Sequence, residues 1–124
     1  MKTTIRSIVL AVPALSKLSA GDLSLRLAYR LKKNIDTIQK EADFFSQQQK
    51  KILDRHGTPG EGGMYTFENN EKEQDAISEL DELLEMEVTL DIPVMEIPIS
   101  EDLRLSVNDI QLIAPFVEFK EEDQ

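Results

Sequence analysis

The 124-residue sequence has no cysteine, no tryptophan and one histidine, His56. Without cysteine the chain cannot form a disulfide scaffold, a thiolate zinc site or a cysteine nucleophile. A single histidine leaves at most one centre for a Ser-His-Asp system or a histidine-based metal cluster. No apolar run approaches the roughly 20 residues that span a bilayer. We therefore expect no enzyme, cofactor or metal site and no membrane segment.

The first residues imitate a secretory signal peptide only loosely. Arg6, Pro13 and Lys17 leave a short and broken apolar core, whereas a signal peptide needs an uninterrupted one. The alternative is an intracellular strand and turn over residues 1–21. Residues 3–12 are rich in β-branched side chains and predict a buried strand, and residues 14–20 predict one or two helical turns before Gly21.

Charge divides the chain into two halves of opposite sign. Residues 1–56 carry eleven Lys and Arg against five Asp and Glu, whereas residues 57–124 carry three against nineteen. The halves have net charges of +6 and −16, and the chain has −10. Packing the halves together neutralises much of this charge and leaves a negative field for partners. The acidic balance argues against direct nucleic-acid binding, which needs Lys and Arg at the phosphates.

Residues 22–56 have the pattern of one long basic helix. Asp22 supplies an N-cap oxygen, Gly57 and Pro59 close the helix, and His56 stands at its end. A helix of roughly 50 Å needs a partner along its apolar stripe. The same stripe permits self-association, although Gln49 interrupts it. Apolar residues at spacings of three and four form the candidate packing seam: Leu31, Ile35, Ile38, Ala42, Phe45 and Ile52.

Residues 70–87 predict the partner helix, which is acidic. Asn70 and Glu73 have the spacing of a capping box. Its outer positions carry the candidate acidic face, Glu79, Asp81, Glu82 and Glu85, and its apolar face carries Ile77, Leu80, Leu83 and Leu84. Antiparallel packing on the basic helix makes a helical hairpin. The glycine-rich loop of residues 57–69 forms the tip of this hairpin. A phosphate-binding loop is disfavoured, because the lysine that such a loop needs is missing.

The rest of the chain completes an α+β fold in a single domain. In the strand segment 88–99, residues 88–92 alternate as a half-buried strand that pairs with residues 3–12, and Pro93 and Pro98 restrict residues 94–99 to an edge or extended segment. Ser106 and Asp109 bracket a short C-terminal helix over residues 106–114. Residues 120–124 form an acidic tail. The prediction is a long helix, a shorter antiparallel helix, a small β-sheet and a short C-terminal helix.

Carboxylates on the second helix have three interpretations. A solvated face that pairs with the basic helix is the usual one for such charge runs. Regularly spaced carboxylates also imitate phosphates against a basic groove. A metal site is disfavoured, because neither a calcium-loop spacing nor a Glu-x-x-His pair is present.

Several short landmarks lie in a characteristic order: LAYRL at 27–31, ILDRHG at 52–57, LDELLEMEV at 80–88, LSVNDI at 105–110 and APFVEF at 114–119. In these the chain resembles a group of small proteins of unknown function encoded by phages and prophages of Gram-positive bacteria. His56 departs from the tyrosine or similar residue that the group has before the closing glycine.

The absent catalytic constellation, the asymmetric charge and the resemblance together predict a non-enzymatic accessory or virion-assembly protein that acts through protein–protein contacts, in the host cytoplasm or on the virion. The expected partner is a phage structural protein or a host protein, with homo-oligomers also open. The resemblance carries over no catalytic, cofactor-binding or metal residue. The alternative is an acidic inhibitor that imitates nucleic acid on a host defence protein.

Overall fold

The computed structural model describes residues 1–99 and 103–121. Within these residues four α-helices and six short strands make an α+β fold built on one long helix, as predicted. The helices are α1 (Ile5–Ser19), α2 (Leu25–His56), α3 (Asn70–Leu84) and α4 (Val107–Ile113), with a 3-10 turn at Glu61–Gly63. The strands are β1 (Lys2–Thr4), β2 (Thr58–Pro59), β3 (Tyr65–Thr66), β4 (Glu87–Thr89), β5 (Met95–Pro98) and β6 (Val117–Lys120).

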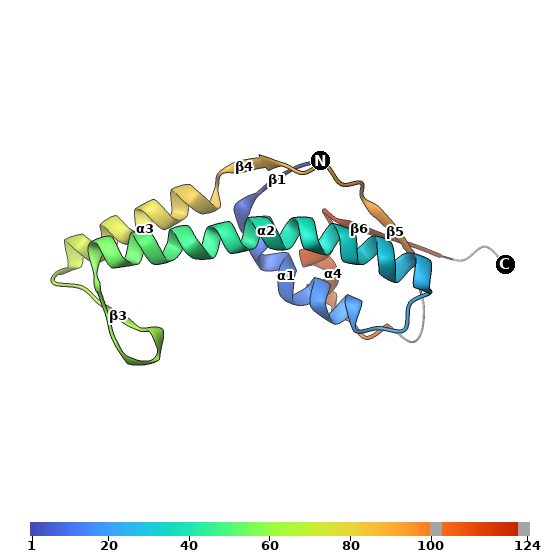
Figure 1. Cartoon of the computed structure of the whole chain (residues 1–124), viewed down its shortest axis with the longest axis horizontal. Helices are drawn as coiled ribbons and strands as arrows, with labels where there is room; N and C mark the ends of the chain where they lie inside the picture. The colour runs from blue at the N-terminus through green and yellow to red at the C-terminus, as the bar shows by residue number, and fades with distance from the viewer. Residues whose placement is uncertain (100–102, 122–124) are drawn as a thin grey trace.

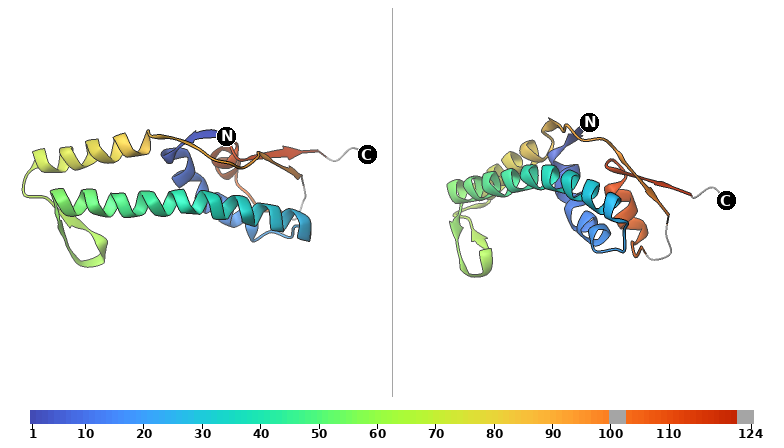
Figure 2. Two further views of the ribbon diagram at one scale, coloured as in Figure 1. Left: turned by 45° about the horizontal axis from the view of Figure 1, so that its top comes forward. Right: turned by 45° about the vertical axis from the view of Figure 1, so that its right-hand side comes forward.

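The long helix α2 is the axis of the molecule. Helix α1 crosses it and carries α4 on its other side, while α3 lies beside the C-terminal half of α2 (Figure 1). The β2–β3 hairpin joins α2 to α3 at the far tip, away from α1 in all views (Figure 2). We call residues 46–84, which comprise the end of α2, this hairpin and α3, the arm.

The predicted buried strand over residues 3–12 is wrong beyond Thr4. The Oγ1 atom of Thr4 accepts a hydrogen bond from the Ser7 N–H and starts helix α1, which continues through Pro13. An apolar run without a polar face fits a buried strand and a buried helix equally well. Burial of one face of the helix outweighs the small helix penalty of β-branched residues. The buried positions follow a helical spacing: Ile5, Ile8, Ala11, Ala14, Leu15 and Leu18.

The predicted pairing of the N-terminus with the segment after the second helix is confirmed at shorter length. Strand β1 pairs antiparallel with β4, and Thr3 lies opposite Val88. The predicted strand over residues 88–99 is divided in two, because the chain leaves β4 near Leu90 and passes Pro93 before β5 begins. Strand β5 pairs in parallel with β6, a strand that the sequence did not predict.

Helix ends differ from the prediction by a few residues. Helix α2 begins at Leu25 with Ser24 as its N-cap, and Asp22 lies before it. Helix α3 has Asn69 as its N-cap and ends at Leu84, not at residue 87. The glycine-rich loop contains strands β2 and β3, whose hairpin is fastened to α2 by a hydrogen bond from Tyr65 Oη to Asp54 Oδ1 (2.5 Å). Of the predicted acidic tail, residues 122–124 lie outside the described residues.

The main core lies where α1, α2, α4 and the β5–β6 pair meet. Phe116 and Val117, which follow α4, are buried in it, and Phe119 packs against it. The candidate seam of α2 is also buried except for Ile35, which is partly covered. Its exposed fractions are 9% or less at Leu31, Ile38, Ala42, Phe45 and Ile52.

The predicted capping box at the start of α4 is confirmed and holds a buried carboxylate. Asp109 is 7% exposed. Its Oδ2 accepts the Ser106 N–H at 3.0 Å, and Lys17 Nζ lies 3.1 Å away. These hydrogen bonds, the Ser106 backbone first and Lys17 second, hold the pKa of Asp109 below its ordinary 3.8.

The lowered pKa of Asp109 predicts a pH-dependent loss of stability. Its contribution is fully present above the unfolded pKa and is lost as the pH falls through the lower folded pKa. We expect Asp109→Asn to be less stable than the parent chain at pH 7, with a difference that shrinks toward pH 3. Urea denaturation at both pH values measures this. The exposed Asp75→Asn serves as control, and an equal deficit for Asp109→Asn at both pH values would contradict the assignment.

Candidate functional site

The four residues of the predicted acidic face do not share one open surface. Glu79 faces α2, where its Oε2 lies 3.2 Å from Arg55 Nη1 and its Oε1 lies 3.1 Å from His56 Nε2. Asp81 and Glu85 pair instead with Arg6 of α1, at 3.9 and 2.7 Å. Glu82 is exposed and makes no ion pair with any described residue.

The two helices neutralise each other less than the charge split predicts. Lys32 pairs with Asp36, and Lys50 with Asp54, each four residues along α2 itself (2.7 and 2.8 Å). Among the described residues, one ion pair, Arg55–Glu79, joins α3 to α2, and His56 Nε2 lies beside the same carboxylate. Exposed ion pairs contribute roughly 0–1 kcal/mol each. The hairpin is therefore held mainly by its apolar seam.

The apolar face of α3 is incompletely covered. Ala76 is the one residue of this helix that is buried among the described residues. Ile77 is 43% exposed, and Leu80, Leu83 and Leu84 are only half-buried. A helix of this kind normally buries a continuous apolar stripe against its neighbours. Along the arm only two helices cover each other's apolar faces, whereas helical bundles usually use three or four.

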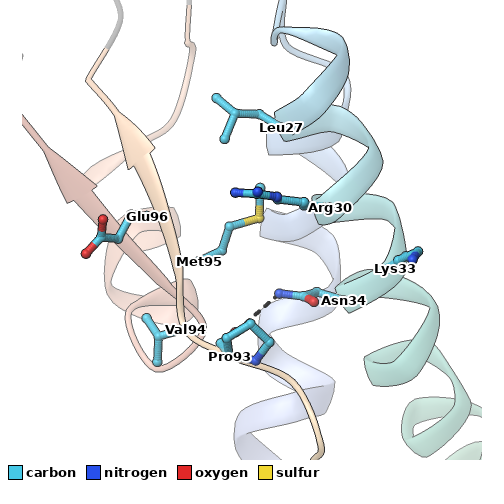
Figure 3. Close-up of a pocket in the computed structure, with 8 residues that line it drawn as sticks. All are labelled: Leu27, Arg30, Lys33, Asn34, Pro93, Val94, Met95 and Glu96. Carbon is cyan, nitrogen blue, oxygen red and sulfur yellow. Dashed lines mark hydrogen bonds between the residues drawn. The ribbon is translucent and has the colours of Figure 1, made fainter.

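A groove of about 540 Å³ runs between the N-terminal part of α2 and strand β5. Figure 3 shows Leu27, Arg30 and Asn34 projecting from α2 toward β5. Asn34 Nδ2 donates a hydrogen bond to the Pro93 carbonyl at 3.3 Å, which fixes the start of β5 against the helix. The lining residues are Leu27, Arg30, Lys33, Asn34, Pro93, Val94, Met95 and Glu96.

Charges around this groove are unevenly placed. Arg30 and Lys33 are exposed and make no ion pair with a described residue. Lys33 lies at the rim, with its Nζ 4.8 Å from the centre of the Tyr29 ring. Glu96 projects away from α2 (Figure 3), and its Oε1 lies 4.0 Å from Lys120 Nζ. Arg30 thus projects into the groove from α2 (Figure 3), and Met95, which is 6% exposed, gives the groove an apolar floor.

One backbone edge of β5 faces this groove, and within residues 1–99 and 103–121 no strand pairs with it. Met95 N–H donates to Phe116 O at 3.0 Å, and Ile99 N–H donates to Lys120 O at 2.8 Å. Alternate residues of a strand direct their backbone groups to opposite edges. The N–H groups of Val94 and Glu96 therefore point away from β6, and no described residue accepts a hydrogen bond from them.

The sequence predicted part of this site. Pro93 and Pro98 correctly indicated an edge segment, since proline is confined to edges and strand starts. Arg26, Arg30 and Lys33 recur at spacings of four and three, which places them on one helix face. Neither signal shows that this helix face and this edge adjoin, because the two are about 60 residues apart in the chain.

Neither a family model nor a curated protein nor a solved structure matches the chain. In the described residues no three His, Asp or Glu side chains gather closely enough to hold a metal ion. No described helix has both the length and the apolar character needed to cross a membrane.

Proposed function

We propose that this chain is a non-enzymatic accessory or virion-assembly protein of phage type that works by binding other proteins. The observation that carries the proposal is the uncovered apolar face of α3. The order of sequence landmarks, which resembles that of small phage and prophage proteins, supports the phage context.

Fewer side chains are buried in the arm than in the body, by which we mean the described residues outside the arm. Helix α1 has six buried residues over its length, whereas α3, of the same 15-residue length, has one among those described. Hydrophobic stabilisation is roughly proportional to the apolar area removed from water, at about 25 cal/mol per Å². A partner that covers Ile77 and the half-buried leucines would therefore add the burial that α2 alone does not supply.

The test is capture of partners by the full chain, with a matched pair of variants on α3. We expect the tagged protein to recover a specific phage structural or host protein from prophage-carrying Gram-positive cells. Ile77→Asp should lower that recovery about tenfold, as loss of an apolar anchor does. Gln74→Asp, which places the same charge on the exposed outer side of the helix, should leave recovery unchanged.

Quantitative mass spectrometry of the captured proteins and light scattering of the purified chain provide the readouts. Because Ile77 and Gln74 are both exposed, equal melting temperatures are the control for folding. Recovery of no partner together with a monomeric chain, or equal recovery by the two variants, would contradict the proposal.

A second candidate is an inhibitor that imitates nucleic acid on a host defence protein. It is favoured by three exposed carboxylates, Glu71, Asp75 and Glu82, which make no ion pair with a described residue. They recur at spacings of four and seven on one side of α3. In the same capture assay this candidate predicts a basic partner whose recovery falls steeply with salt. It also predicts that charge reversal at these three positions abolishes recovery of the partner, whereas Ile77→Asp recovers the partner as the parent chain does.

A further inference from the structure

We propose that the groove between α2 and β5 binds an extended acidic peptide segment of a partner protein, which adds a strand to the open edge of β5. This goes beyond the proposed function, because the groove lies outside the arm and its occupant is defined by different chemistry.

The backbone of β5 supplies the first part of the argument. Extended peptides bind exposed sheet edges through main-chain hydrogen bonds, and pockets for alternate side chains add specificity. The N–H groups of Val94 and Glu96 are free of described partners on the groove side. Natural proteins usually block such edges. Here Pro93 and Pro98 limit the available edge to residues 94–97, enough for a short peptide.

The groove itself supplies the second part. Its volume of about 540 Å³ lies within the roughly 300–1,000 Å³ of typical ligand sites. Met95 and Leu27 give it an apolar floor, and Val94 is 47% exposed at its side. An extended segment places alternate side chains on opposite faces. One set therefore meets this apolar floor while the other is free to reach Arg30.

Charge selects an acidic segment. Arg30 projects from α2 toward β5 (Figure 3), whereas Lys33 lies one turn further on at the rim, with its Nζ beside the Tyr29 ring. A carboxylate of the bound segment therefore meets the Arg30 guanidinium, which makes no ion pair with a described residue. Glu96 does not oppose it, since it projects away from the groove (Figure 3) and pairs with Lys120.

A second copy of this chain fits the edge poorly. Two β5 strands related by a two-fold axis would bring Glu96 of one protomer close to Glu96 of the other, and like charges opposite each other are destabilising. A helix also fits poorly, because its backbone groups are already hydrogen-bonded to one another. An extended acidic peptide from another protein has free backbone groups to pair with the edge of β5 and carboxylates to meet Arg30.

The experiment measures binding of a fluorescent probe peptide to the full chain by anisotropy. The probe has about eight residues that alternate Val and Glu, long enough for the four-residue strand. We expect saturable binding that is at least about tenfold weaker for a probe alternating Val and Lys. N-methylation of the amides that face the edge should abolish binding, since it removes the main-chain hydrogen bonds.

Variants of the protein locate the probe. Arg30→Glu with Lys33→Glu should weaken binding at least about tenfold. The control, Lys40→Glu with Lys51→Glu, makes the same change of charge on exposed positions elsewhere on α2 and should not weaken it. Equal binding by the two double variants, or by the methylated and unmethylated probes, would overturn the proposal.

The arm variant separates this result from the proposed function. Ile77→Asp should bind the probe as the parent chain does, because Ile77 is not among the residues that line the groove. Loss of probe binding in Ile77→Asp would overturn the assignment to the groove. Probe binding without partner capture by the arm would leave this inference standing and contradict only the proposed function.

Discussion

Replacing Ile8 by alanine is expected to lower the free energy of unfolding by about 2–5 kcal/mol, the range for a large aliphatic side chain cut back in a packed core. Ile8 is fully buried, with 0% of its side chain exposed, and belongs to the main core cluster. Its removal leaves a cavity between α1 and the helices that pack on it. Urea denaturation followed by circular dichroism measures the change.

The matched variant is Leu10→Ala, two residues further on. Leu10 is 49% exposed, so its loss should cost about 1 kcal/mol or less. In a strand, residues 8 and 10 would share one face and both would be buried or both exposed. Similar losses for the two variants would therefore contradict the helix. The helical arrangement requires a large loss of unfolding free energy in Ile8→Ala and a small loss in Leu10→Ala.

Replacing Phe45 by alanine is expected to cost about 3–5 kcal/mol. Phe45 belongs to the seam of α2 and is 8% exposed, and it lies where the arm leaves the body. Its loss opens space next to α1, because Phe45 lines the same small depression as Val9 and Val12 of that helix. The urea midpoint should fall strongly, as the apolar seam holds the arm where ion pairs are few.

The adjacent Phe44→Ala is the control for this variant. It removes the same side chain from a position that is 39% exposed, and we expect a loss of about 1 kcal/mol or less. The two chains have identical composition, so the difference between them isolates burial. If Phe44→Ala were as destabilising as Phe45→Ala, the face of α2 that meets its neighbours would have to be redefined.

The two proposed surfaces lie at different ends of one rigid element. Helix α2 has 32 residues, which correspond to about 48 Å. The groove adjoins its N-terminal part, and the arm contains its C-terminal part (Figure 1). A chain with this arrangement would hold two partners at a set separation, which suits an accessory role in assembly.

Local sequence was sufficient for the elements whose signals are complete within a few turns. The seam of α2 was predicted because spacings of three and four persist over many turns and one face is polar. The capping box of Ser106 and Asp109 was predicted because both hydrogen bonds lie within four residues. The partner helix was located for the same reason, although its cap proved to be Asn69 in place of Asn70.

Only the tertiary structure decided which contacts these elements make. Residues 5–12 are helical because the fold buries one helical face of this segment, whereas its apolar run has no polar alternation that would distinguish strand from helix. Strand β6 exists because β5 lies beside it, and the acidic residues Asp81 and Glu85 are neutralised because the fold brings Arg6 to them. The sequence by itself determined the long amphipathic helix, its end at Gly57 and the division of charge. The pairing of segments far apart in the chain, and with it both proposed surfaces, depends on burial summed over the whole molecule.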